Sequence, residues 1–282
     1  MRYTAWKSSG QRVRLMGREV FVREAGAGPP LLFFHGFPTT SYDWSDVFAA
    51  LESKNRCIAF DFWGFGDTDP LDAYDYDKQT DLALAVAKHF GVERAVIVAH
   101  DYGVTVAQEL LARRAPALAI DGVVFLNGGI DPRLHRPIAI QRLLASPLGA
   151  WVGPLLVRKA TFRRSMARII AVTDRFDIDE HWSAMSARGA HRRSHQLLHY
   201  IAERQSRRDR LVSAFSDRAT PVALAWGERD PVSGAHVLAW AKGARPDAEA
   251  LALPVGHYPQ VESPAEVSAL IARFADRVQR SA

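Results

Sequence analysis

Short runs of consecutive apolar residues dominate the first half of the sequence, and each run ends at polar or small residues. Four of them cover residues 31–34, 57–60, 95–99 and 123–126, and none shows polar and apolar residues in alternation. Runs of this kind suit strands that are buried on both faces, as in a parallel sheet covered by helices. Helical stretches at about 42–53, 76–90 and 103–114 lie between the runs and supply crossover connections. These features predict an α/β fold with a mostly parallel, doubly wound sheet.

The pattern of strands stops at about residue 131 and resumes near residue 221. Residues 131–215 contain only amphipathic stretches, whereas strand-like runs return at 221–226 and 250–253. A last helix places one set of apolar side chains on a single face: Val267, Leu270, Ile271, Phe274 and Val278. We therefore expect a core domain formed by residues 1–130 and 216–282, with a helical cap domain, residues 131–215, inserted into it.

Composition narrows the class of protein. Of the 282 residues, 48% are hydrophobic and 24% are charged, which is typical of a globular protein and excludes a disordered chain. The single cysteine, Cys57, excludes a disulfide framework and any metal site built from several cysteines. No apolar run approaches the roughly 18 residues that span a bilayer. Residues 1–7 have no apolar signal region, so we expect a cytoplasmic protein without a membrane span.

Positive charge is concentrated in the expected cap. Residues 131–215 hold 16 Lys and Arg against 7 Asp and Glu, while the whole chain has a formal net charge of +5. This surplus fits either an ordinary solvated arginine-rich face or a surface that attracts anionic substrates or partners. Aromatic residues are not interleaved with the basic ones, and no nucleic-acid reading motif is present, so we expect no nucleic-acid partner. A small-molecule substrate is expected, and the sequence leaves a monomer and a homodimer equally open.

Two patterns that resemble cofactor sites are incomplete. His191, His195 and His199 are spaced four residues apart, but no acidic ligand lies within that run and arginines adjoin it. The Gly-x-Gly sequences at 26–28 and 64–66 lack the third glycine of a dinucleotide-binding turn. We therefore expect neither a metal nor an organic cofactor.

Candidate catalytic residues follow three of the strand-like runs. In open α/β sheets, ligands bind beyond the carboxyl ends of the strands. Asp101, Asp230 and His257 occur there in the chain order of a nucleophile, an acid and a base. Asp101 also lies between two small residues, Ala99 and Gly103, as the apex of a sharp strand-to-helix turn requires. The alternative for Asp101 alone is a helix cap, a position that Asp favours.

The residue type at this apex restricts the chemistry. A carboxylate displaces a leaving group from saturated carbon and forms an ester with the enzyme, which water then cleaves. His257 would be the general base for that water, and Asp230 would orient the imidazole, although Glu228 is also allowed by spacing. The backbone N–H groups of Phe37 and Tyr102 are the expected oxyanion hole.

At these residues the sequence resembles the α/β-hydrolase superfamily, in the branch with Asp nucleophiles that includes epoxide hydrolases and haloalkane dehalogenases. The motifs that carry this resemblance are 35–38 (HGFP), 61–66 (DFWGFG), 100–103 (HDYG), 126–129 (LNGG) and 256–260 (GHYPQ). Within the branch, residues 36–44, 100–103 with 107–111, and 127–130 with 135–137 resemble the mesoderm-specific transcript group and its bacterial relatives. The resemblance also places His35, Trp63 and Asn127 around the substrate.

Departures from the family pattern separate the two activities. Haloalkane dehalogenases hold the halide with a Trp after the nucleophile and often with an Asn in the first motif, where this chain has Tyr102 and Phe37. Epoxide hydrolases use two cap tyrosines to protonate the ring oxygen. Tyr200 matches one of them, and no other tyrosine lies in 131–215, although His135 could serve as the second donor. The resemblance therefore favours an epoxide hydrolase, with a haloalkane dehalogenase or a non-catalytic ligand-binding protein as alternatives.

Overall fold

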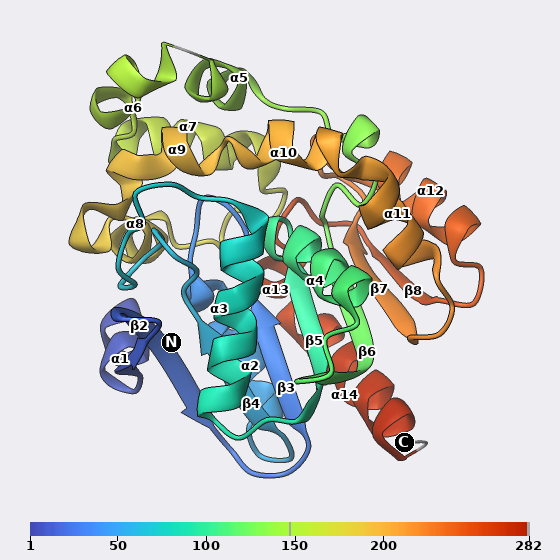
Figure 1. Cartoon of the computed structure of the whole chain (residues 1–282). Coiled ribbons are helices and arrows are strands. Elements are labelled where there is room, and N and C mark those ends of the chain that lie inside the picture. Colours follow the sequence, from blue (N-terminus) through green and yellow to red (C-terminus); the bar gives the residue numbers. More distant parts are fainter. Residues whose placement is uncertain (147, 281–282) are drawn as a thin grey trace.

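The computed structural model describes residues 1–146 and 148–280 and contains one eight-stranded sheet (Figure 1). The strand order is β1-β2-β4-β3-β5-β6-β7-β8. The strands are β1 (Gln11–Leu15), β2 (Arg18–Ala25), β3 (Pro30–Phe34), β4 (Arg56–Phe60), β5 (Arg94–His100), β6 (Ala119–Leu126), β7 (Val222–Gly227) and β8 (Glu249–Leu253). All neighbours from β4 to β8 pair in parallel, whereas β1–β2 and β2–β4 are antiparallel. The expected mostly parallel sheet is confirmed.

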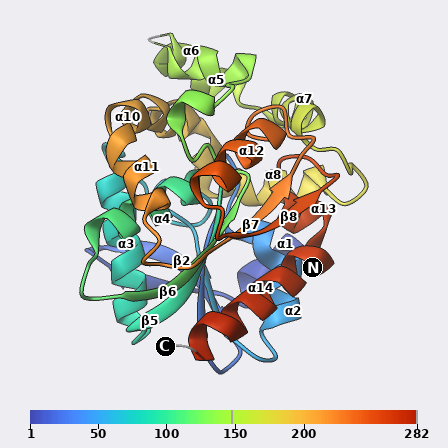
Figure 2. The ribbon, with the colours of Figure 1, turned by 90° about the vertical axis from the view of Figure 1, so that its right-hand side faces the viewer.

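Alternate residues of the central strands point to opposite faces of the sheet, and both faces are covered. Leu32, Phe34 and Ile97 belong to one core cluster, while Phe33 and Val96 belong to the other. Helices α3 (Tyr76–His89), α4 (Tyr102–Arg113) and α12 (Ala235–Ala244) cover the first face, and α2 (Ser45–Leu51) and α14 (Pro264–Arg280) cover the second (Figure 2). Burial on both sides explains why these strands are continuous apolar runs.

The remaining elements of the core are short. They are α1 (Tyr3–Ser8), the 3₁₀ helix η1 (Ser41–Trp44) and α13 (Pro259–Glu262). Met16 and Gly17 both have positive φ in the β1–β2 turn, which is the conformation that a two-residue hairpin of this twist requires.

Residues 131–215, called the helical segment below, lie above the carboxyl ends of the parallel strands (Figure 1). Their described part contains helices and no strand. The elements are η2 (Pro132–Leu134), α5 (Ala139–Ala145), α6 (Gly149–Leu156), α7 (Lys159–Ile169), α8 (Ile178–Met185), η3 (Ala187–Arg193), α9 (Ser194–Leu197), α10 (Tyr200–Ser206) and α11 (Arg208–Ser216). The last helix, α11, extends one residue beyond the end of the helical segment. The three spaced histidines fall in or beside three different elements, η3, α9 and the start of α10, rather than on one continuous helix.

Several arginines of the helical segment form ion pairs with acidic residues of the sheet domain, by which we mean the described residues outside 131–215. Arg188 pairs with Asp69 at 2.8 Å, and Arg207 pairs with Asp77 at 2.6 Å. Arg210 holds Glu109, whose side chain is 2% exposed, at 2.9 Å. Part of the excess positive charge of the helical segment is therefore neutralised by carboxylates of the sheet domain. No helix of the described chain is long and apolar enough to cross a membrane.

Candidate active site

Asp101 occupies the apex of a sharp turn between β5 and α4. Its backbone has φ 44° and ψ −103°, a conformation that non-glycine residues rarely adopt. Gly103 permits this turn because a Cβ there would lie 2.6 Å from the backbone oxygen of Phe34. The turn places the Asp101 carboxylate at the end of the sheet, and the surrounding structure supports the strain. This is the strand-to-helix geometry in which hydrolases of this kind present a nucleophile.

The carboxylate of Asp101 is buried yet polarised by its neighbours. One oxygen, Oδ2, accepts a hydrogen bond from the backbone N–H of Phe37 at 3.0 Å. Burial raises the pKa of Asp101, while His257, the Phe37 N–H and Arg204 act to lower it. The expected oxyanion donor on Phe37 thus already binds the carboxylate, and Tyr102 follows Asp101 directly as the first residue of α4.

His257 lies between two carboxylates. Its Nδ1 is 2.7 Å from Oδ2 of Asp230, and its Nε2 is 3.8 Å from Oδ1 of Asp101. Burial lowers the pKa of His257, but Asp230 and Asp101 more than offset this and raise it to about 9. Burial raises the pKa of Asp230, but the charge and hydrogen bond of His257 and the hydrogen bond of Asn127 outweigh burial and hold this pKa well below its usual range. The short contact with Asp230 orients the imidazole, whereas the distance from Nε2 to Asp101 is longer than a hydrogen bond.

The first comparison with known proteins settles the family. The model for "Alpha/beta hydrolase family" matches residues 31–270. The chain belongs to the alpha/beta hydrolase family. It is 32% identical to the Mesoderm-specific transcript homolog protein of Bos taurus, over 92% of this chain and 84% of that protein.

Two solved structures share the fold of this alpha/beta hydrolase. The haloalkane dehalogenase DbeA from Bradyrhizobium elkani is 22% identical, with a TM-score of 0.84 over 97% of this chain and 99% of that one. The epoxide hydrolase CorEH is 20% identical, with a TM-score of 0.78 over 94% of this chain and 97% of that one. At these identities the likeness concerns the fold.

Two residues that we expected to contact substrate instead support the site of this alpha/beta hydrolase from behind. His35 has both ring nitrogens engaged, because Nδ1 donates to the Gly36 carbonyl at 2.9 Å and Nε2 accepts from the Phe62 N–H at 3.0 Å. The side-chain N–H groups of Asn127 donate to Asp230 and to the carbonyl of Gly227, and its side-chain oxygen accepts from the N–H of Gly227. Neither side chain keeps the free polar group that substrate contact was expected to use.

Trp63 is also buried, with 2% of its surface exposed, and its backbone N–H donates to the Gln79 side chain at 2.9 Å. It packs in the core cluster beside α3 and α4. The structure therefore places Trp63 in the hydrophobic core, and it is not among the residues that line the cavity beside His257.

Tyr200 is the first residue of α10, and its ring lies among aromatic side chains near Asp101. Its ring centroid is 5.1 Å from that of Tyr102 and 6.2 Å from that of Phe37. Its hydroxyl is buried and has no hydrogen-bond partner. Burial, followed by the nearby Asp101 charge, raises its pKa well above the usual value. Tyr200 is therefore protonated, and its hydroxyl is close enough to Asp101 for that charge to act on it.

His135 follows η2, and the charges of His257 and Asp230 act on it. Burial, with added contributions from Arg204 and His257, lowers its pKa to about 3. Its Nε2 atom is buried without a partner. His135 is thus a neutral imidazole with one unsatisfied nitrogen near the site.

Two further residues near the site were missed by the sequence analysis. Arg204 lies four residues after Tyr200, hence on the same face of α10, and it is 2% exposed. Tyr76 begins α3, and its ring lies 6.1 Å from Tyr200. The spacing of Tyr200 and Arg204 was a signal that could have identified the arginine, whereas Tyr76 belongs to the sheet domain and gave no such signal.

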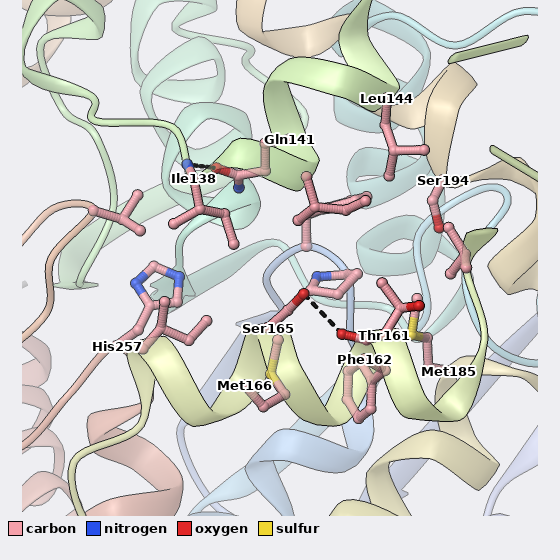
Figure 3. A pocket seen from close by; sticks show the side chains of 16 residues that line it. Ile138, Gln141, Leu144, Thr161, Phe162, Ser165, Met166, Met185, Ser194 and His257 are labelled. Atoms are coloured by element: carbon pink, nitrogen blue, oxygen red, sulfur yellow. Dashed lines mark hydrogen bonds between the residues drawn. The ribbon is translucent and has the colours of Figure 1, made fainter. Parts of the chain in front are cut away.

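A mostly apolar cavity opens beside His257 (Figure 3). His257 and Phe37 line it on the sheet side, and the helical segment supplies most of the remaining wall. Figure 3 shows His257 at one end and Met185 and Ser194 at the other, with α7 carrying Phe162 and Met166 between them. Such a cavity suits a substrate with an apolar body.

Proposed function

We propose that this alpha/beta hydrolase opens epoxides through a covalent ester on Asp101. Two observations together carry the proposal: Asp101 stands at the strained apex of the turn, and the buried hydroxyl of Tyr200, on which the Asp101 charge acts, has no partner. A carboxylate attacks saturated carbon, and an epoxide needs an acid for the oxygen that remains attached. The helical segment, residues 131–215, serves as the cap domain that carries this acid.

The first step forms a bond between an Asp101 carboxylate oxygen and an epoxide carbon. The ring C–O bond breaks, and the ring oxygen takes the proton of the Tyr200 hydroxyl. His135 supplies a second N–H donor in the tautomer protonated at Nε2, which replaces the second cap tyrosine. The Phe37 N–H remains bound to the other oxygen of Asp101.

The second step hydrolyses the ester. Water attacks the carboxyl carbon of Asp101 while His257 Nε2 takes its proton and Asp230 stabilises the imidazolium. The N–H groups of Phe37 and Tyr102 stabilise the oxyanion. Collapse of the intermediate breaks the bond between the carboxyl carbon and the oxygen that Asp101 supplied to the alkyl carbon. This oxygen takes the proton from His257 and leaves in the diol. The proton of the new carboxyl group returns to Tyr200, which restores Asp101 as a carboxylate with one oxygen from water.

The surroundings of Asp101 favour an epoxide over a haloalkane. Phe37 has no side-chain donor, and the Tyr102 hydroxyl interacts with Gln79. A departing halide would therefore lack the two side-chain N–H donors that dehalogenases provide, whereas the epoxide oxygen meets the hydroxyl of Tyr200.

The test is to trap the ester. In His257→Gln the second step is blocked, so incubation with styrene oxide should add the full mass of the epoxide to a peptide containing Asp101. Asp101→Asn is the control and should show no adduct. Incubation with 1-bromobutane should leave the protein unmodified. Absence of the epoxide adduct, or a butyl adduct with bromide release, would overturn the proposal.

A further inference from the structure

Arg204 is a buried cation whose hydrogen-bonding capacity is not met within the protein. Its Nε and Nη2 atoms are buried and have no hydrogen-bond partner. Among the described residues no carboxylate forms an ion pair with it. The nearby Glu203 accepts from the Tyr76 N–H and pairs with Arg207 at 3.2 Å. A guanidinium remains charged in proteins, so leaving two of its donors unsatisfied in the interior is costly.

The unpartnered atoms form a specific recognition edge. Nε and Nη2 lie on the same side of the guanidinium and bind the two oxygens of a carboxylate together. Other arginines of this chain use this edge for that purpose: Arg208 on Asp131, Arg210 on Glu109 and Arg245 on Asp247. In Arg204 the same edge lacks its carboxylate.

The position of Arg204 connects this edge with the reaction site. The guanidinium lies against Gly129, where a Cβ would be 2.7 Å from Nη2, so the absence of a side chain there makes room for it. Arg204 shares a helix face with Tyr200, and its charge acts on Asp101, Tyr76 and His135. The cavity beside His257 is lined mainly by apolar side chains, and His257 is the one titratable side chain among its described lining residues.

We infer that Arg204 binds a carboxylate of the substrate through Nε and Nη2, so that the natural substrate is an epoxide with an apolar body and an acidic group. This substrate class rests on the proposed function. The carboxylate completes the side-on pair that Arg204 lacks, and the apolar body occupies the cavity lined by α5 and α7. Binding the acid would also fix the epoxide carbon relative to Asp101.

Binding of unreactive probes tests the inference without catalysis. We expect calorimetry to show that the wild-type protein binds 4-phenylbutanoate at least about 10-fold more tightly than 4-phenylbutanamide, as a charge-assisted bidentate contact requires. Arg204→Gln should remove the preference, and Arg204→Lys should retain only a part of it because lysine lacks the planar edge. Arg192→Gln removes an exposed positive charge from the same segment and should keep the preference.

Turnover of 3-phenylglycidate and its amide separates the inference from the proposed function. A carboxylate preference in binding without opening of either epoxide would support the carboxylate site at Arg204 but overturn the proposed function, and with it the assignment of the substrate as an epoxide. Equal opening of acid and amide by the wild type, together with equal binding of the two probes, would overturn the inference and leave the function. If Arg204→Gln does not fold, the wild-type ratio and Arg204→Lys decide the question.

Discussion

Asn127 Nδ2 donates to Asp230 Oδ2 at 3.0 Å, and this is the same oxygen that accepts from His257 Nδ1 at 2.7 Å. Asn127 also bridges to Gly227, because Nδ2 donates to its carbonyl and Oδ1 accepts from its N–H at 2.6 Å. Asn127, which directly follows β6, therefore fixes both the Asp230 carboxylate and Gly227, the last residue of β7. Asn127 is a positioning residue for the triad.

Replacing Asn127 by Ala should lower both stability and activity. The change leaves a buried N–H of Gly227 unpaired, which costs about 1–3 kcal/mol of unfolding free energy. It also removes one of the groups that lower the pKa of Asp230. Urea unfolding and epoxide turnover are the measurements. Asn55→Ala is the matched control, because Asn55 donates only to the Pro29 carbonyl at 3.4 Å. Equal effects of the two variants on turnover would contradict the positioning role.

Tyr200→Phe should slow ester formation without weakening the fold. Loss of a positioned general acid costs roughly 10²–10⁴-fold in rate. Since the Tyr200 hydroxyl is buried without a partner, its removal should leave the unfolding free energy equal or higher. Single-turnover mass spectrometry with styrene oxide measures the rate. The control is Tyr42→Phe, which removes a hydroxyl bonded to the Met1 carbonyl away from the site. Unchanged ester formation in Tyr200→Phe would remove Tyr200 from the mechanism.

Ester formation should lower the pKa of His257. In the free enzyme Asp230 and then Asp101 raise this pKa to about 9 against the effect of burial. The ester neutralises Asp101, so one of these contributions disappears. We expect NMR titration of the free enzyme to show a midpoint near 9, and the pH profile of ester hydrolysis to show a lower one. A free-enzyme midpoint at or below the ordinary 6.5 would contradict this.

The same shift makes stability depend on pH. A pKa raised in the folded state stabilises the protein below the unfolded value, and this stabilisation is lost as pH rises through the folded value. The wild type should therefore lose up to roughly 3 kcal/mol of unfolding free energy between pH 6.5 and 9 through His257. His257→Gln should lack that loss. Urea unfolding of both proteins at the two pH values checks it, and parallel behaviour of the two would refute it.

Gly103→Ala should damage the turn that presents Asp101. A Cβ at this position would lie 2.6 Å from the Phe34 backbone oxygen, which cannot move aside cheaply. We expect a loss of about 1–3 kcal/mol in unfolding free energy and reduced ester formation. Gly243→Ala is the control, because a Cβ there meets nothing within 4 Å and a helical alanine should gain about 0.5–1 kcal/mol. If Gly103→Ala behaved like this control, the close packing of the turn would not matter.

The sequence was sufficient to predict the sheet and the chain order of the site. Apolar runs without alternation identified the buried strands, because only strands covered on both faces tolerate them. Asp101, Asp230 and His257 could be found because parallel strands bring their carboxyl ends to one edge of the sheet. The small residues beside Asp101 indicated the turn, since the backbone there leaves no room for a side chain.

Only the tertiary structure decided which polar groups are satisfied. His35 and Asn127 have the residue types of substrate ligands, but their donors and acceptors are taken by partners that the fold supplies, in one case 103 residues away. Many arginines of the helical segment have carboxylate partners, whereas Arg204 has none among the described residues. A hydrogen bond depends on distance and direction in space, and local sequence specifies neither between residues far apart in the chain.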